Sequence, residues 1–113
     1  MPTVDFCDLI ETIEKEMEIR HEQMEKAVIN ADISSLIQLM RDAENESHAF
    51  VDMLKNQHDK CKEAAGSMHN SAISDLEELV EREIEYIRNI KSIGNCRLST
   101  ALVATEMERL NLK

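Results

Sequence analysis

The sequence predicts an all-α protein built from antiparallel helical hairpins. Two observations predict this fold class: the 113 residues include only 2 Gly and 1 Pro, and apolar side chains recur at spacings of three and four. A sandwich or barrel of short strands would need many more turn-forming residues. Because the chain has about the length of one domain, we expect a single helical domain over residues 1–113.

The first two predicted helices form a long hairpin. The first covers residues 4–29, and its apolar side chains make one stripe that is broken by Arg20. Asp32 follows the stripe and is a typical N-terminal cap for the next helix. That second helix is expected over residues 33–65, where Gly66-Ser67 predicts its end. The short connection between them predicts an antiparallel pair, the hairpin of residues 4–65.

A shorter hairpin is predicted over residues 71–111. Its first helix covers about residues 71–93 and begins there or at the capping box Ser74-Asp75-Leu76-Glu77. Ile93-Gly94-Asn95 predicts the end of this helix, and a last short helix is capped by Ser99 or Thr100. Together the two hairpins predict a four-helix bundle.

The two predicted hairpins differ in length. The far end of the second helix, about residues 54–65, is therefore expected to lack a cover within the chain. A second copy would cover it and complete the bundle. We expect a homodimer or a higher homo-oligomer.

The chain is acidic, with 23 Asp and Glu against 13 Lys and Arg and a formal net charge of −10. It lacks the basic clusters that bind nucleic acid or an anionic membrane surface, so neither is an expected partner. No apolar stretch has the length of a membrane span, residues 1–5 lack the pattern of a secretory signal, and the widely spaced Cys residues favour reduced thiols, so we expect a cytoplasmic protein. An acidic run in the third helix is interpreted as a solubilising surface: Glu77, Glu78, Glu81, Glu83 and Glu85.

Two polar residues interrupt the second predicted helix. Its apolar stripe, followed from Ile33 in steps of four and three, has Glu44 in its middle, and His48 lies one turn further on. At i and i+4 the two side chains project from one face, where they can bind one metal ion or hydrogen-bond to each other. A buried carboxylate needs a partner, and an acidic bundle recruits cations. Both interpretations stay open.

The first predicted helix has a matching set of side chains. Glu14, Glu18 and His21 lie beside its apolar stripe, and Glu18-x-x-His21 has the spacing of metal ligands in helical bundles. With the turn near Asn30, an antiparallel hairpin is expected to bring Glu14 to the level of Glu44. Carboxylates and an imidazole that converge in a bundle suit iron or manganese. A solvated, salt-linked helix face is the alternative interpretation of Glu18 and His21.

The segments EKEMEIRH, residues 14–21, and RDAENESHAF, residues 41–50, resemble the helical hairpin of the ferritin-like and rubrerythrin-like proteins. In that superfamily a Glu on one helix and a Glu-x-x-His on the next hold a di-iron centre that reacts with dioxygen or peroxide. Its short, half-sized members complete the centre between two chains. The resemblance implies that Glu14, Glu44 and His48 bind iron, with Glu18 and His21 nearby.

Two functions of different classes follow. The first is a metal-binding bundle that oxidises ferrous iron or reduces peroxide. The second is a non-catalytic helical adaptor or chaperone-like module, which holds another helix with an acidic face and a groove containing Met24, Met40 and Met53. The sequence has no Gly-rich phosphate loop and no nucleophile motif. Whether the chain is an enzyme stays open.

Overall fold

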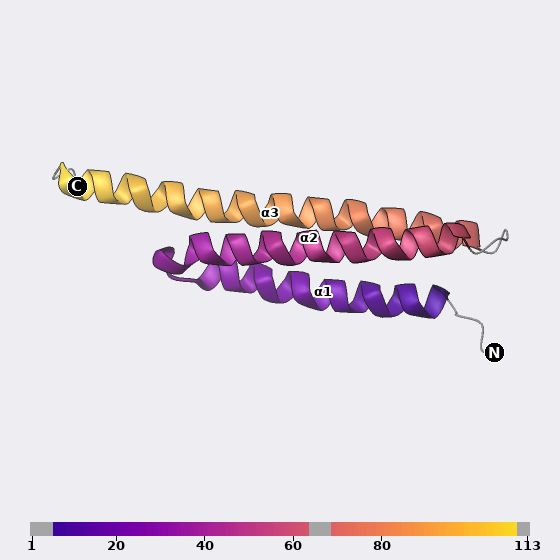
Figure 1. The fold of residues 1–113 in the computed structure, drawn as a ribbon. Helices are drawn as coiled ribbons and strands as arrows, with labels where there is room; N and C mark the ends of the chain where they lie inside the picture. Colours follow the sequence, from indigo (N-terminus) through magenta and orange to yellow (C-terminus); the bar gives the residue numbers. More distant parts are fainter. Residues whose placement is uncertain (1–5, 64–68, 111–113) are drawn as a thin grey trace.

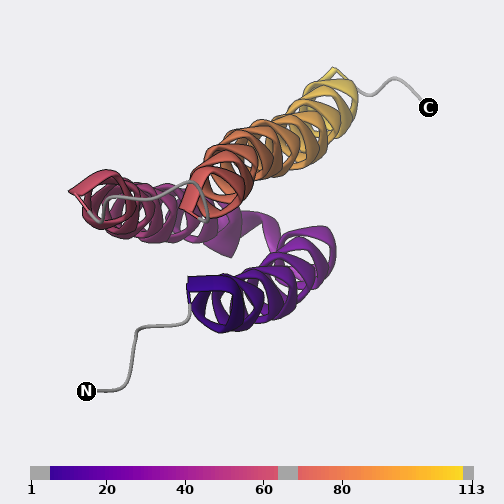
Figure 2. The ribbon, with the colours of Figure 1, turned by 90° about the vertical axis from the view of Figure 1, so that its right-hand side faces the viewer.

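The computed structural model describes residues 6–63 and 69–110, which form α1 (Phe6–Asn30), α2 (Ile33–Glu63) and α3 (His69–Arg109). The three helices lie side by side along a molecule with extents of 71 × 17 × 17 Å, and α3 projects beyond the turn between α1 and α2 (Figure 1). Seen along the long axis, they occupy the corners of a triangle (Figure 2). The described residues are thus all-helical, as predicted, and none of their helices contains a stretch apolar enough to span a membrane.

The bounds of α1 and α2 agree with the prediction, because apolar periodicity and the break after Asn30 are local signals. The predicted start at residue 4 and the predicted stop at Gly66-Ser67 lie outside the described residues. Arg97 of α3 secures the turn between the two helices. Its Nη1 donates to the carbonyl oxygens of Val28 and Ala31 at 2.8 and 2.6 Å. These carbonyls lie at the C-terminal end of α1, where the helix itself supplies no donors.

The prediction of two short helices is wrong, because α3 runs unbroken through Ile93-Gly94-Asn95. Gly94 is buried under the Met40 side chain of α2, with which a Cβ at this position would collide. This glycine therefore permits a close approach of two helices and does not end one. Thr100 is no cap either, since its hydroxyl donates to the Cys96 carbonyl inside the helix. The described residues of one chain supply three helices, so they do not form the four-helix arrangement by themselves.

Buried side chains form two apolar clusters along the molecule. The first, nearer the N-terminus, contains Ile10, Ile13, Met17, Leu54, Cys61, Ala72, Leu76 and Leu79, and the second contains Val28, Leu36, Ala43, Tyr86 and Ile90. The first cluster covers the far end of α2, where Leu54 and Cys61 are buried. The expectation of an uncovered end is therefore wrong for residues 54–63, because α3 starts early enough to pack along it. Residues 64 and 65 lie outside the described ranges.

The buried face of α2 is rotated from the predicted stripe. Leu36, Ala43, Ser47, Leu54 and Cys61 are buried, whereas Ile37, on the predicted stripe, is 53% exposed. α2 packs against α3 and α1 together, so its buried face lies between those two helices and not along its most apolar line. This rotation turns several apolar side chains of α2 toward the surface.

Candidate functional site

Two carboxylates predicted as metal ligands, Glu14 and Glu18, bind Arg82 of α3. Arg82 Nη1 donates to Glu14 Oε2 at 2.7 Å, and Nη2 donates to Glu18 Oε1 at 3.1 Å. Partial burial lowers the pKa of Arg82, but its hydrogen bonds to Glu18 and Glu14 and the charges of both outweigh burial, so the pKa is raised. These contacts make the salt-linked helix face that was the alternative interpretation of Glu18.

Glu44 and His48, the predicted ligands on α2, lie near the surface. Glu44 Oε1 is 3.4 Å from Lys91 Nζ and 3.7 Å from His48 Nε2, and the His48 side chain is 75% exposed. The predicted common level of Glu14 and Glu44 is wrong: their partners, Arg82 and Lys91, are separated by roughly 13 Å along α3 at the usual helical rise. Glu44 and His48 are thus near each other, and Glu14 is not with them.

Within a single chain, the described side chains do not assemble a di-iron or manganese centre. Over residues 6–63 and 69–110, no group of three or more His, Cys, Asp or Glu side chains is arranged to hold a metal ion. A di-iron centre needs carboxylates that are free to bridge the ions. Here Arg82 and Lys91 bind the carboxylates in question.

His21, the remaining predicted ligand, belongs to a buried and partly buried polar group that we call the polar centre: Arg20, His21, Ser47, Glu83 and Tyr86. Glu83 is fully buried. Its Oε1 accepts hydrogen bonds from Arg20 Nη2 and, at 2.9 Å, from His21 Nε2, and its Oε2 accepts one from Ser47 Oγ at 2.6 Å. The rings of His21 and Tyr86 stack with their centroids 3.7 Å apart. All three helices therefore meet at one carboxylate.

The polar centre separates the two apolar clusters. In α3, for example, Glu83 lies after Leu79 of the first cluster and before Ile90 of the second. Because one buried carboxylate must be matched with its donors, the polar centre favours a single register of the three helices. This register places His21 of α1 near Ser47 of α2. The number of residues between each side chain and the turn does not predict this register. For this reason Glu14 and Glu44 were expected to lie at the same level.

Burial and the neighbouring charges set the protonation states in the polar centre. Burial raises the pKa of Glu83, but hydrogen bonds from His21, Ser47 and Arg20 and the charge of Arg20 outweigh it, so this pKa is lowered from its ordinary value. Burial is also the main reason why the pKa of Tyr86 rises to about 12. Within the described residues, Tyr86 Oη and Arg20 Nη1 are buried without a hydrogen-bond partner. The centre is thus an ionised Glu83 beside a neutral phenol.

The polar centre lacks the geometry of a nucleophilic site. In a Ser-His-acid site the imidazole lies between the hydroxyl and the carboxylate. Here Ser47 and His21 both donate to the same carboxylate, and Ser47 is buried. No imidazole therefore activates the hydroxyl, and a substrate has no access to it. The arrangement holds the three helices together.

The interpretation of Glu83 as solubilising surface is wrong, and a pattern in the sequence marks the error. Leu76, Leu79, Glu83, Tyr86 and Ile90 follow one another at spacings of three and four, so Glu83 lies on an apolar stripe. All five are buried. Arg20 interrupts the stripe of the first helix in the same way. A basic and an acidic residue that each interrupt a stripe predict an ion pair between them.

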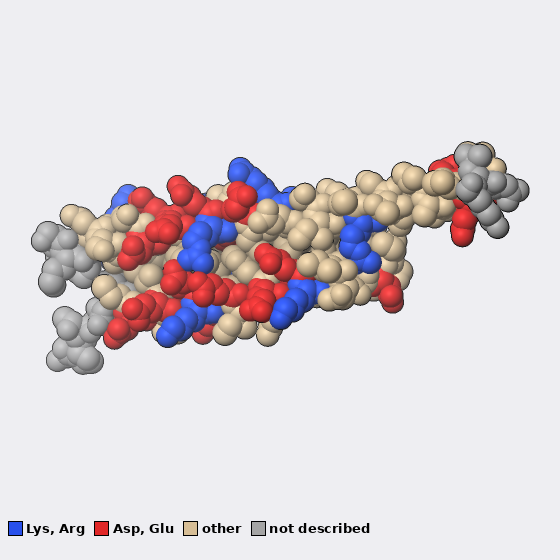
Figure 3. Space-filling model, turned by 180° about the vertical axis from the view of Figure 1, so that it is seen from behind, with Lys and Arg blue, Asp and Glu red and all other residues tan. Residues whose placement is uncertain are grey.

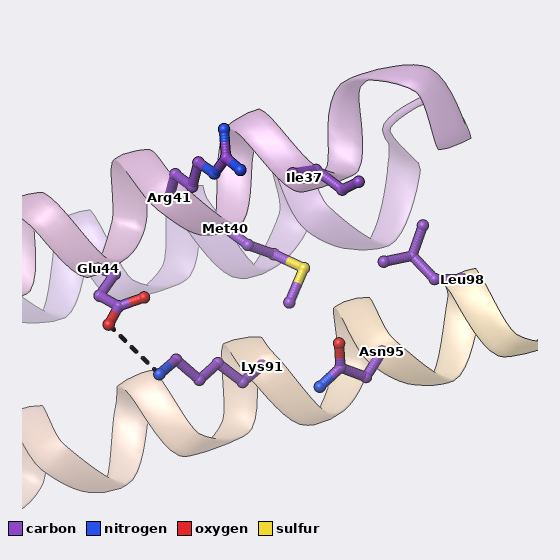
Figure 4. Close-up of a pocket in the computed structure, with 7 residues that line it drawn as sticks. All are labelled: Ile37, Met40, Arg41, Glu44, Lys91, Asn95 and Leu98. Atoms are coloured by element: carbon purple, nitrogen blue, oxygen red, sulfur yellow. Dashed lines mark hydrogen bonds and ion pairs between the residues drawn. The ribbon is translucent and has the colours of Figure 1, made fainter.

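A second feature is the α2–α3 groove, an open depression between these two helices. It consists of pockets of about 350 and 220 Å³ whose apolar walls are Ile37, Met40, Val51, Ile84, Ile87 and Leu98. Figure 4 shows Met40 and Leu98 pointing into the space between the helices, with the ion pair of Glu44 and Lys91 crossing it. Arg41 stands at the edge. The groove is therefore apolar inside and carries basic groups at its border.

The projecting end of α3 continues from this groove. We call residues 99–110 the α3 extension. Leu102, Val103, Met107 and Leu110 on it are 45% to 68% exposed. Residues 98–105 contain no charged side chain, although 32% of the chain is charged. Figure 3 shows charged residues over the three-helix part, an uncharged stretch along the projecting part and acidic side chains at its tip. The extension is an exposed helix with apolar side chains and few charges.

Comparison of the chain with protein-family models, curated proteins and solved structures found no match. The ferritin-like resemblance therefore stays a prediction from the sequence.

Proposed function

We propose that this chain is a non-catalytic helical protein-binding module whose α2–α3 groove accepts another helix. The groove itself carries the proposal: Ile37 and Ile84 on its two walls are 53% and 43% exposed, and the exposed apolar residues of the α3 extension adjoin it. Contiguous exposed apolar side chains mark binding surfaces in folded proteins. An amphipathic helix that lays its apolar face into such a groove is a common mode of recognition.

The border of the groove favours a helix with acidic flanks. Arg41 and Lys91 stand there, in a chain whose formal net charge is −10. Within the described residues Arg41 has no ion-pair partner, so a carboxylate of a bound helix can pair with it. Met40 lines the interior, and its flexible thioether adapts to side chains of different shape. The proposed partner is thus an amphipathic helix with acidic residues beside its apolar face.

The metal-binding interpretation has no such support. Glu14 and Glu18 are engaged by Arg82, and Glu44 is engaged by Lys91. The proposed function involves Lys91 at the border of the groove. It requires no metal ion bound by these carboxylates.

Displacement of a bound dye tests the proposal. At low protein concentration we expect the fluorescence of an anilinonaphthalene sulfonate dye to rise when it binds the groove. An amphipathic helical peptide with Glu flanks should displace it, and the same peptide with Lys flanks should displace it less. Ile37→Gln should weaken dye and peptide binding, whereas Ile19→Gln, on exposed α1 surface outside the groove, should not. Dye binding that is absent, or that Ile37→Gln leaves unchanged, would overturn the proposed function.

A further inference from the structure

We propose that the helix which fills the α2–α3 groove is the α3 extension of a second copy of this chain, in a two-fold symmetric dimer. This inference rests on the proposed function, because it names the partner of the same groove. The α3 wall of the groove runs from Ile84 to Leu98, and the extension begins at the next residue. A two-fold axis that crosses α3 beside residue 97 lays each extension over the other chain's groove. Such an arrangement closes at two copies.

The two parts match in length. At a rise of ~1.5 Å per residue, the extension is roughly 18 Å long and the α3 wall of the groove roughly 21 Å. In its own chain the extension projects past the turn between α1 and α2, so neither helix covers it (Figure 1). An antiparallel neighbour would find the groove free over the length that it needs.

The order of residues on α3 is self-complementary when two copies run antiparallel. If Leu110 of one copy lies against Ile84 of the other, one turn inward places Glu106 against Arg88. Two further turns place Ser99 against Asn95, beside the two-fold axis. Spacings of four and seven put the residues of each half on one face of α3, and all of them are exposed. At these three pairs of positions the register matches apolar with apolar, acidic with basic and polar with polar, twice in each dimer, and between them Leu102 and Val103 lie against Ser92 and Lys91.

A parallel arrangement of two copies lacks this match. In a parallel two-fold pair each side chain meets its own counterpart, so Glu106 would face Glu106 and Arg88 would face Arg88. In the isolated chain Glu106 is paired with Arg109, and Arg88 with Glu85 at 3.6 Å. These are exposed pairs between neighbours on one helix, and such pairs are readily exchanged because they contribute little. The antiparallel register replaces them with contacts between chains.

The net charge of the chain also favours an interface at the α3 extension. Two chains that each carry −10 repel one another, so a stable pair must meet where negative charge is sparse. Residues 98–105 provide such a place, since they carry no charge. Figure 3 shows the contrast between the projecting end and the densely charged three-helix part.

Charge reversal combined with solution mass tests the dimer. We expect sedimentation equilibrium to show a dimer whose dissociation constant rises about tenfold for Arg88→Glu and for Glu106→Arg, because each creates two like-charge contacts. The double variant Arg88→Glu/Glu106→Arg should restore the wild-type value. Leu110→Glu, which sets a carboxylate against Ile84, should abolish the dimer, whereas Ile19→Glu, at an equally exposed site on α1, should leave it intact. Circular dichroism checks that each variant is folded.

The outcomes separate this inference from the proposed function. A monomer at every concentration, with dye and peptide binding intact, would overturn the dimer and leave the groove as a site for another helix. A dimer whose dissociation constant does not change in the charge-reversal variants would also overturn this inference. So would a double variant that does not restore the wild-type dissociation constant. A monomer that binds neither dye nor peptide would overturn both proposals. A dimer that responds to the charge reversals as expected supports both proposals. Dye binding should then fall as the protein concentration rises, because the dimer covers the groove.

Discussion

The polar centre and the α3 extension use their residues in opposite ways. In the polar centre, charged and polar side chains are buried inside the bundle, and Glu83 is held by donors from α1 and α2. In the extension, apolar side chains such as Leu102 are exposed and residues 98–105 carry no charge. A buried ion pair costs desolvation and adds specificity. An exposed apolar helix gains stability only when another surface covers it.

This contrast shows which part of the chain finds its interaction partners within the chain and which part does not. The polar centre finds its partners within one chain, and it fixes how the three helices meet. The extension has no helix beside it within its chain (Figure 1). The role of the buried polar residues is therefore structural, and the proposed role of the exposed apolar residues is binding.

Loss of the Glu83 carboxylate is expected to have the largest effect. Glu83→Ala leaves the partly buried Arg20 and His21 without their acceptor, and we expect it to lower the free energy of unfolding by about 3–5 kcal/mol. Chemical denaturation followed by circular dichroism measures this. Glu81→Ala, at an exposed site on the same helix, should change it by less than about 0.5 kcal/mol. Equal denaturation midpoints for the two variants would show that the polar centre does not hold the helices together.

The titration of Tyr86 is expected to show the next largest effect. Its pKa is raised to about 12 in the folded chain, against about 10 for an unperturbed tyrosine. Because the folded pKa is the higher one, the stability that the neutral phenol contributes is complete below pH ~10 and is lost as the pH rises through ~12. Tyr86 is the single tyrosine, so tyrosinate absorbance reports on it alone. A midpoint near that of the urea-unfolded chain would contradict the packing of the polar centre.

Arg97, at the border between the two regions, should show a smaller effect. Arg97→Met removes the donor to the carbonyls of Val28 and Ala31, and we expect a loss of about 1–3 kcal/mol in the free energy of unfolding. Hydrogen exchange should also quicken in the last turn of α1. Arg109→Met, on the extension, removes only an exposed pair with Glu106 and should change the stability by less than about 0.5 kcal/mol. If both variants behave alike, the turn does not depend on α3.

Local patterns predicted the first two helices and the all-helical class, because periodicity and the break at Asn30 act within a few residues. They failed at Gly94, where the requirement is the approach of Met40 from another helix. They also failed at Glu83, because its place within an acidic run suggests that its side chain is exposed to solvent. The stripe through Leu79, Glu83 and Tyr86 was available to correct this. His21 was singled out in the sequence, and in the structure its hydrogen-bond partner is Glu83.

The sequence by itself determined that the chain is helical, acidic and poor in turns, because these properties follow from residue type and local spacing. The tertiary structure decided which polar residues are buried and which apolar ones are exposed. Each side chain's burial depends on how two other helices rotate and slide against its own, and that is a property of the whole set of contacts. Within that set, the match of Glu83 with Arg20, His21 and Ser47 favours one register. The same packing leaves the groove and the α3 extension at the surface.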